Sequence, residues 1–125
     1  MAKLTKEDQT ARVERLPGFE GRYTDSDGYT IGFEKFEEDA DMAPYFRGLP
    51  NDMCQSSHWG YVIRGRVTYH RAEGDEVIEA GQAYYVGPGH TPEVAADTEV
   101  VEFSPTEELA RTMEVVSRNF ETDTT

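Results

Sequence analysis

The chain of 125 residues is long enough for one domain with a single core, and its formal net charge of −13 comes from 25 acidic and 12 basic residues. Because Lys and Arg are few and do not cluster, this charge excludes a surface that binds nucleic-acid phosphates. No apolar stretch approaches the roughly 18 residues that a membrane helix needs, and the first 15 residues lack the apolar core of a signal peptide. We therefore expect a cytoplasmic protein with neither nucleic acid nor a membrane as partner.

The N-terminal segment has weak signals for a short polar helix. Thr5 is a suitable N-cap for a helix over residues 5–15, Asp8 stands in the capping-box position, and Pro17-Gly18 would end the helix. The segment contains few apolar residues, so an extended arm that packs on a partner subunit is the alternative.

Residues 23–102 have the pattern of short β-strands. A turn at residues 24–28 leads into residues 29–34, in which Tyr, Ile and Phe alternate with Thr, Gly and Glu. After an irregular acidic stretch, further strands are expected at residues 59–64, 66–71, 76–79, 83–86 and 99–103. Many short strands with regular turns are typical of a sandwich or barrel.

The last predicted element is a helix. Ser104-Pro105-Thr106-Glu107 supplies an N-cap, a proline at the first helical position and a capping-box acid. Apolar residues then recur at helical spacing and predict a face that packs against the barrel: Leu109, Met113, Val116 and Phe120. We expect the barrel at about residues 23–104 and the helix at about residues 105–120, within a single domain that spans residues 1–125.

The strand predicted at residues 59–64 carries large apolar residues on both faces. Trp59, Tyr61 and Ile63 lie on one face and Val62 on the other. A strand with one solvated face should alternate apolar with polar residues, so the larger set must be covered. The second sheet, the terminal helix or another subunit could cover it, and we favour a homodimer.

Residues 52–65, DMCQSSHWGYVIRG, resemble the first motif of the cupins. That motif consists of His-x-His, a gap of three or four residues, Glu, six further residues and Gly. The spacing places Asp52 and Cys54 at the two His positions, His58 at the Glu position and Gly65 at the Gly position.

Residues 81–92, GQAYYVGPGHTP, resemble the second cupin motif. That motif consists of Gly, five residues, Pro-x-Gly, two residues and His. Gly81 and Gly89 fit, and the proline is shifted by one position to Pro88. Pro92 occupies the His position, and His90 lies two residues before it.

The resemblance covers about residues 25–104 and identifies the chain as a small single-domain cupin. It implies an all-β fold, a double-stranded β-helix or jelly-roll barrel, here with a C-terminal α-helix and a short N-terminal arm or helix. Cupins include dioxygenases, isomerases, decarboxylases, lyases, epimerases and non-catalytic binding domains, so the fold does not name a reaction. None of the four usual metal-ligand positions keeps its usual residue. The sequence therefore leaves open whether the protein is an enzyme.

The first functional hypothesis is a divalent transition metal held by Cys54, His58 and His90, with Asp52 as a further ligand or a neighbour of the ligands. Thiolate and imidazole together favour zinc, iron or copper. On a straight strand Cys54 and His58 would be roughly 13 Å apart, so a shared ion requires a bend at residues 55–57. If catalytic, such a site would act on a small organic molecule, by oxygen chemistry with iron or copper, or by isomerisation or hydrolysis with zinc.

The second hypothesis is a metal-free, non-catalytic cupin that binds a small organic molecule. His58 and His90 would then supply hydrogen bonds or acid–base groups. Four aromatic residues would line the mouth of the barrel: Trp59, Tyr69, Tyr84 and Tyr85. A Cys54–His58 nucleophile pair has no supporting motif. The glycine-rich turn lacks the features of a phosphate-binding loop, so no nucleotide cofactor is expected. His70 is expected on the surface.

Overall fold

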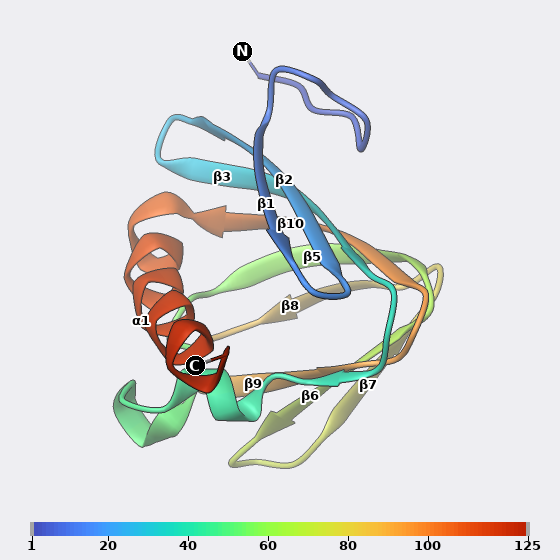
Figure 1. Ribbon diagram of the computed structural model, residues 1–125. Helices are drawn as coiled ribbons and strands as arrows, with labels where there is room; N and C mark the ends of the chain where they lie inside the picture. The colour runs from blue at the N-terminus through green and yellow to red at the C-terminus, as the bar shows by residue number, and fades with distance from the viewer. Residues whose placement is uncertain (1, 125) are drawn as a thin grey trace.

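The computed structural model describes residues 2–124 and shows two antiparallel β-sheets that face each other, with a long helix beside them (Figure 1). The six-stranded sheet has the order β1 (Arg12–Leu16), β2 (Phe19–Ser26), β3 (Tyr29–Phe36), β10 (Thr98–Pro105), β5 (His58–Arg64), β8 (Ala83–Val86). The four-stranded sheet has the order β4 (Ala40–Asp41), β9 (His90–Val94), β6 (Arg66–Arg71), β7 (Glu76–Glu79). Two short 3-10 helices, η1 (Ala43–Phe46) and η2 (Pro50–Asp52), and the helix α1 (Thr106–Thr124) complete the described chain.

The main core lies between the two sheets. Side chains from both sheets meet there, and the buried set is Phe36, Val62, Val86 and Val100 from the larger sheet with Val67, Tyr69, Ile78 and Val94 from the smaller one. A second buried cluster of Phe46, Cys54 and Val116 joins the connection between β4 and β5 to the helix. Figure 1 shows α1 at one end of the two sheets.

The N-terminal helix predicted at residues 5–15 is wrong. The Asp8 side chain accepts hydrogen bonds from the backbone N–H and the hydroxyl of Thr10, at 2.8 and 2.7 Å, and so closes a tight turn instead of capping a helix. The chain then enters β1, which pairs with β2 over its whole length, from Arg12 opposite Tyr23 to Leu16 opposite Phe19. Cross-strand pairing thus overrides weak local helix signals.

The strands predicted at residues 66–71, 76–79 and 83–86 are confirmed residue for residue, and those at 59–64, 29–34 and 99–103 are confirmed with slightly longer bounds. Strand β9 was not predicted because its centre is Pro92, a residue that lacks the N–H of a regular ladder. Pro92 has no pairing partner in the two-residue strand β4, and its carbonyl accepts a hydrogen bond from the N–H of Met42, at 3.0 Å, just after that strand.

The predicted C-terminal helix is confirmed as α1, with its start at Thr106 because Pro105 still belongs to β10. The side-chain amide of Asn119 donates to the carbonyls of Tyr45 and Arg47, both at 2.8 Å, and so attaches the helix to η1. Within residues 2–124, α1 included, no helix has the length and apolar character needed to cross a membrane.

The apolar outer face of β5 remains uncovered by the described part of the chain. Trp59, Tyr61 and Ile63 point away from the second sheet and are 37% to 44% exposed. Neither the second sheet nor α1 covers them, which leaves another subunit among the three predicted alternatives.

Candidate functional site

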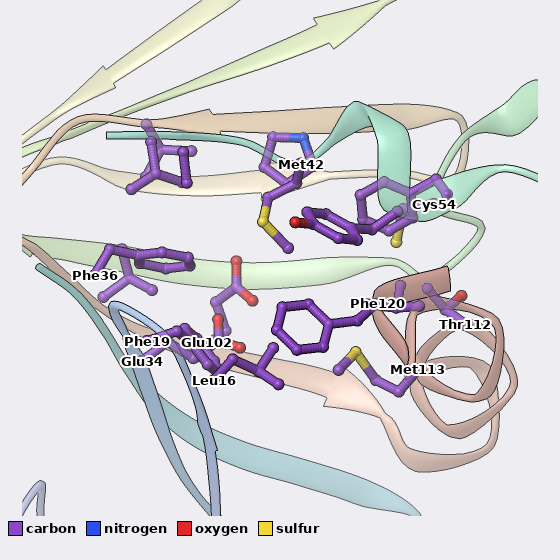
Figure 2. Close-up of a pocket in the computed structure, with 18 of the residues that line it drawn as sticks. Leu16, Phe19, Glu34, Phe36, Met42, Cys54, Glu102, Thr112, Met113 and Phe120 are labelled. Carbon is purple, nitrogen blue, oxygen red and sulfur yellow. The ribbon is translucent and has the colours of Figure 1, made fainter. Parts of the chain in front are cut away.

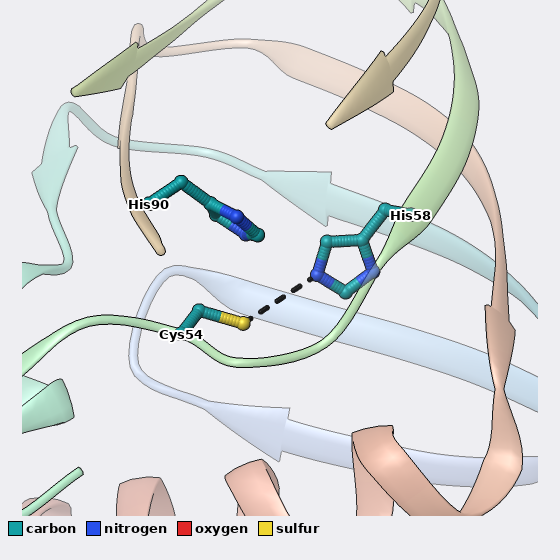
Figure 3. Close-up of side chains that lie close together, drawn as sticks. All are labelled: Cys54, His58 and His90. Atoms are coloured by element: carbon teal, nitrogen blue, oxygen red, sulfur yellow. Dashed lines mark hydrogen bonds between the residues drawn. The ribbon is translucent and has the colours of Figure 1, made fainter. Parts of the chain in front are cut away.

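Cys54, His58 and His90 form a buried cluster inside the barrel, and Figure 3 shows their side chains converging from three separate segments. One ligand atom from each residue lies within 4.8 Å of the other two. The closest approach is between Cys54 Sγ and His58 Nε2, at 3.6 Å. The rings of His58 and His90 meet edge to face, with centroids 5.2 Å apart.

The bend required at residues 55–57 is present, because β5 begins only at His58. Cys54 is held by an isolated bridge to His90: its N–H donates to the His90 carbonyl at 2.8 Å, and its carbonyl accepts from Gly89 N–H at 2.7 Å. The N–H of Ser57 donates to the Glu108 carboxylate of α1 at 3.0 Å. These contacts fold the segment back, so that Cys54 and His58 meet instead of lying far apart along one strand.

Hydrogen bonds orient both imidazole rings. His90 Nδ1 donates to the carbonyl of Gly87 at 2.7 Å, which leaves Nε2 with its lone pair toward the cluster. Burial, and next the nearby His58, lower the pKa of His90 to about 4, so this ring is neutral at neutral pH. His58 Nδ1 lies 2.7 Å from the hydroxyl of Ser104, and its Nε2 faces Cys54. A neutral ring held through one nitrogen is the form that binds a metal through the other.

Cys54 is buried, and burial raises the pKa of its thiol to about 12. Without a metal the side chain is therefore a neutral thiol at neutral pH, which is a weak nucleophile. This argues against a Cys54–His58 nucleophile pair. A metal ion would bind the thiolate and release the proton.

Asp52 lies outside the cluster. It is exposed, has a positive φ of 55°, and ends the short helix η2 before the chain enters the barrel. Its carboxylate accepts a hydrogen bond from Gly48 N–H at 3.1 Å, so its contact in this structure is with the turn.

A pair of carboxylates that the sequence analysis did not identify lies beside the cluster. Glu34 of β3 and Glu102 of β10 are hydrogen-bonded to each other, and Figure 2 shows them side by side among apolar side chains. Glu102 accepts hydrogen bonds from the hydroxyls of Tyr69, at 2.8 Å, and Tyr84, and its other oxygen lies 3.8 Å from His58 Nδ1. The Tyr23 hydroxyl donates to Glu34 at 2.7 Å.

One proton is shared within this pair. Burial, and then the charge of Glu102, raise the pKa of Glu34 to about 8. Burial also raises the pKa of Glu102, but the nearby His58 and the hydrogen bonds from Tyr84, Tyr69 and Glu34 outweigh it and lower the pKa overall. At neutral pH Glu34 is therefore the protonated donor and Glu102 the ionised acceptor.

Two glycines make room for the tyrosines. In the strand register Gly32 and Gly60 flank Glu102 on β3 and β5. A Cβ at Gly32 would lie 2.7 Å from the ring of Tyr23, and one at Gly60 would lie 2.4 Å from the ring of Tyr84. The rings therefore lie directly over the glycine backbone, which brings their hydroxyls to the two carboxylates.

The cluster and the carboxylate pair face the same cavity, of about 180 Å³. Its walls are mainly apolar and come from both sheets, the β1–β2 hairpin and α1; Leu16, Phe19, Phe36, Met42, Met113 and Phe120 are seen in Figure 2. No Lys or Arg is among the described side chains that line it, whereas four carboxylates are: Glu34, Glu38, Asp39 and Glu102.

Only part of the aromatic set predicted for the mouth lies there. Tyr69 lines the cavity, and Tyr84 lies inside the barrel beside it. Trp59 and Tyr85 are on the outer face of the larger sheet, where their ring centroids are 5.0 Å apart, so their assignment to the mouth is wrong. His70 lies at the surface as expected, 2.8 Å from both Asp75 and Glu93.

A sequence signal for Glu102 exists in its own strand. Val101 and Phe103 point outward, so Glu102 must point inward with Val100. A glutamate on the inner face of a central strand requires a partner, which marks it as a functional candidate. Its partners come from other strands, so they follow only from the register.

No model of a known protein family matches the sequence, and no curated protein matches it. Solved structures do match. An RmlC-like cupin from Shewanella frigidimarina NCIMB 400 aligns with a TM-score of 0.57 and 14% identity, over 83% of this chain and 92% of the other. KdgF from Halomonas sp. aligns with a TM-score of 0.54 and 22% identity, over 75% and 86%. The polyketide cyclase RemF from Streptomyces resistomycificus aligns with a TM-score of 0.59 and 15% identity, over 85% and 80%.

These similarities and the two-sheet topology show that the chain has the cupin fold, as its two motifs predicted. At these levels of identity the similarity defines the fold and not the reaction. The function must be argued from the cluster and the cavity.

Proposed function

We propose that this chain is a metal-binding cupin that acts on or binds a small organic molecule. The observation that supports it is the convergence of one sulfur and two imidazole nitrogens within 4.8 Å, all on buried side chains. These donors suit zinc, iron or copper. The hydrogen bonds from His90 to Gly87 and between His58 and Ser104 are of the kind that orient metal-binding histidines.

Cys54, His58 and His90 would hold the ion, and three protein ligands are the number typical of sites that keep a position open for water or substrate. A bound transition ion supplies Lewis acidity to a substrate oxygen. The protein supplies the remainder: apolar walls that exclude water, and Glu102, which accepts hydrogen bonds beside the cluster. Glu34 keeps a proton next to Glu102.

Metal analysis of protein purified without a histidine tag tests the proposal. We expect about one transition-metal ion per chain in the wild type, and loss of at least nine-tenths of it in the Cys54→Ser, His58→Ala double variant. His70→Ala is the matched control, because His70 lies outside the cluster, and it should keep its metal. Circular dichroism confirms that each variant is folded. A metal-free wild type whose Cys54 titrates as an ordinary buried thiol would contradict the proposal.

The second candidate is a metal-free cupin that binds a small molecule. The high pKa of the Cys54 thiol favours it, because a neutral thiol is stable in the buried site without an ion. The same metal analysis separates the two candidates. We also propose a cytoplasmic location, supported by a free cysteine at the centre of the site, which suits a reducing compartment.

A further inference from the structure

We infer that the cavity takes a neutral, ring-sized organic molecule carrying a hydroxyl group, and that it discriminates against carboxylates and phosphates. The inference rests on the proposed function in one respect, that this cavity is the binding site. Three properties of the cavity support it: the volume, the charge of the lining side chains and their hydrogen-bonding groups.

The size of the cavity restricts the ligand. A volume of about 180 Å³ is much smaller than the pockets that hold drug-sized molecules. It is close to the roughly 150 Å³ of an engineered protein cavity that binds benzene. One six-membered ring with a small substituent therefore fits, and the apolar side chains of Phe36, Met42 and Phe120 would surround it.

The charge of the cavity disfavours anions. A buried carboxylate or phosphate needs a cationic partner, usually Arg or Lys, and the described lining residues include neither. The lining includes the acidic side chains of Glu38, Asp39 and Glu102, which do not bind anions.

The hydrogen-bonding groups of the cavity favour a ligand that donates. Glu102 accepts hydrogen bonds from the hydroxyls of Tyr69 and Tyr84 through one oxygen, its other oxygen lies 3.8 Å from His58 Nδ1, and the side chain is also hydrogen-bonded to Glu34. A carboxylate has about four acceptor sites, so one remains for a ligand hydroxyl. A hydroxyl at this place would also lie beside the metal cluster, because Glu102 and His58 are 3.8 Å apart.

Two probes of nearly equal shape, 4-methylphenol and 4-methylbenzoate, test the inference. Binding to the wild-type protein is measured by titration of backbone amide signals in NMR at neutral pH. We expect 4-methylphenol to bind at least tenfold more tightly, with shifts at Cys54, His58 and Glu102. Equal or tighter binding of 4-methylbenzoate, tighter binding of 4-methylbenzylamine, or no binding of 4-methylphenol would each overturn the inference.

A Glu102→Gln variant examines the role of the carboxylate. It keeps the size of the side chain and removes the charge, so the preference for the phenol should fall below threefold. Glu73→Gln, an exposed carboxylate outside the cavity, should leave the preference unchanged. Metal content is measured on the same samples. Phenol binding without metal would contradict the metal centre alone, and metal without phenol preference would contradict this inference alone.

A second, independent observation concerns the outer face of the larger sheet, which we propose is covered by a second copy of this chain. Six large apolar side chains on this face are between 37% and 57% exposed: Tyr29, Trp59, Tyr61, Ile63, Tyr85 and Phe103. The register makes them continuous, because Phe103 lies opposite Trp59, which lies opposite Tyr85. Together these side chains expose roughly 500 Å² of surface, which is as large as the largest apolar patches on typical monomers. This area is a large share of the about 800 Å² that each partner buries in a stable interface.

The charge distribution favours a second copy at this face. Two chains with a charge of −13 each repel one another, so they can associate only where the surface is locally neutral. At the border of the patch Glu99 forms ion pairs with Lys6, at 3.3 Å, and with Arg64, at 3.4 Å. The charge of Glu99 is therefore balanced within each copy.

The mass of the protein in solution decides this second proposal. Sedimentation equilibrium should give twice the chain mass of 14.1 kDa at micromolar concentration. Tyr61→Glu and Phe103→Glu should give monomers with an unchanged circular dichroism spectrum. Val77→Glu is the matched control, since Val77 is 50% exposed on the other sheet, and it should remain dimeric. A monomeric wild type, or variants that stay dimeric, would reject the proposal.

Discussion

Glu34 and Glu102 illustrate at the residue scale how burial turns two identical side chains into different chemical groups. Both are enclosed by the barrel, and two carboxylates in contact cannot both ionise without a large electrostatic cost. The two tyrosine hydroxyls on Glu102 stabilise its negative charge, so the proton resides on Glu34. The pair thus presents a fixed donor and a fixed acceptor next to the cluster.

The pKa of Glu34 predicts a loss of stability at high pH. Its pKa rises from an ordinary 4.5 to about 8 on folding, so its stabilising contribution is complete below pH 4.5 and is lost as the pH rises through 8. A Glu34→Gln variant keeps a hydrogen-bond donor without the titration. Between pH 5 and 8.5 the wild type should lose a few kcal/mol of unfolding free energy relative to this variant, measured by urea unfolding. Parallel profiles, as expected for the exposed Glu73→Gln control, would refute the assignment.

His90 predicts the opposite dependence in metal-free protein. Its pKa falls from 6.5 to about 4 on folding, so its contribution is present above pH 6.5 and is lost as the pH drops toward 4. Relative to His90→Gln, the metal-free wild type should therefore become less stable between pH 7 and 4, by a few kcal/mol. His70 serves as a contrast, because the hydrogen bonds that its ring donates to the carboxylates of Glu93 and Asp75 raise its pKa. Relative to His70→Gln, stability should rise slightly as the pH falls. Equal slopes for the two variants would disprove both assignments.

At the element scale, local signals predicted those elements whose ends and faces are encoded in nearby residues. The strands at 66–71, 76–79 and 83–86 are bounded by turns with Gly or Asp, and their pattern needs no distant partner. The helix predicted at residues 5–15 was wrong because strand β1 forms by pairing with β2, and a helix-capping pattern carries no information about that pairing. Strand β9 was missed because its proline argues against a strand locally, whereas its pairing with β6, which places Pro92 opposite Tyr69, is a long-range feature.

Gly60 carries a prediction for strand β5. An alanine there would place its Cβ 2.4 Å from the ring of Tyr84, so the ring must move and its hydrogen bond to Glu102 must weaken. Gly60→Ala should lower the unfolding free energy by about 1–3 kcal/mol, the usual effect of overpacking. Chemical denaturation measures this change. Gly87→Ala is the control, because its nearest neighbour is the exposed and movable Tyr85, at 3.3 Å, and a change as large as that of Gly60→Ala would contradict the explanation.

At the scale of the whole molecule, the cluster of Cys54, His58 and His90 lies where three parts of the chain meet. Cys54 belongs to the connection from β4, His58 to the larger sheet and His90 to the smaller one. An ion shared by these residues would fasten the two sheets together at the cavity. Metal binding is therefore expected to be coupled to global stability.

Thermal unfolding with and without metal tests this coupling. Binding to the native state alone stabilises it by about 2.7 kcal/mol at a free ligand concentration of 100 times Kd. Zinc added to chelator-treated wild type should therefore raise Tm by several degrees, since 1 kcal/mol corresponds to roughly 4 °C for a domain between the small and the larger size classes. The Cys54→Ser, His58→Ala variant should show no such rise. An equal rise in that variant would place the binding elsewhere.

The cupin fold could be predicted from local sequence, because glycine turns and strand alternation are short-range features that persist when the side chains of the site change. Residue type and motif position also indicated Cys54, His58 and His90 as candidates. That their ligand atoms meet follows from long-range contacts, namely the bend at residues 55–57 and the bridge between Cys54 and His90. The same holds for Glu34 and Glu102, which are far apart in the chain. Their contact depends on strand register and on two glycines that leave space for tyrosine rings, and neither can be inferred from local sequence.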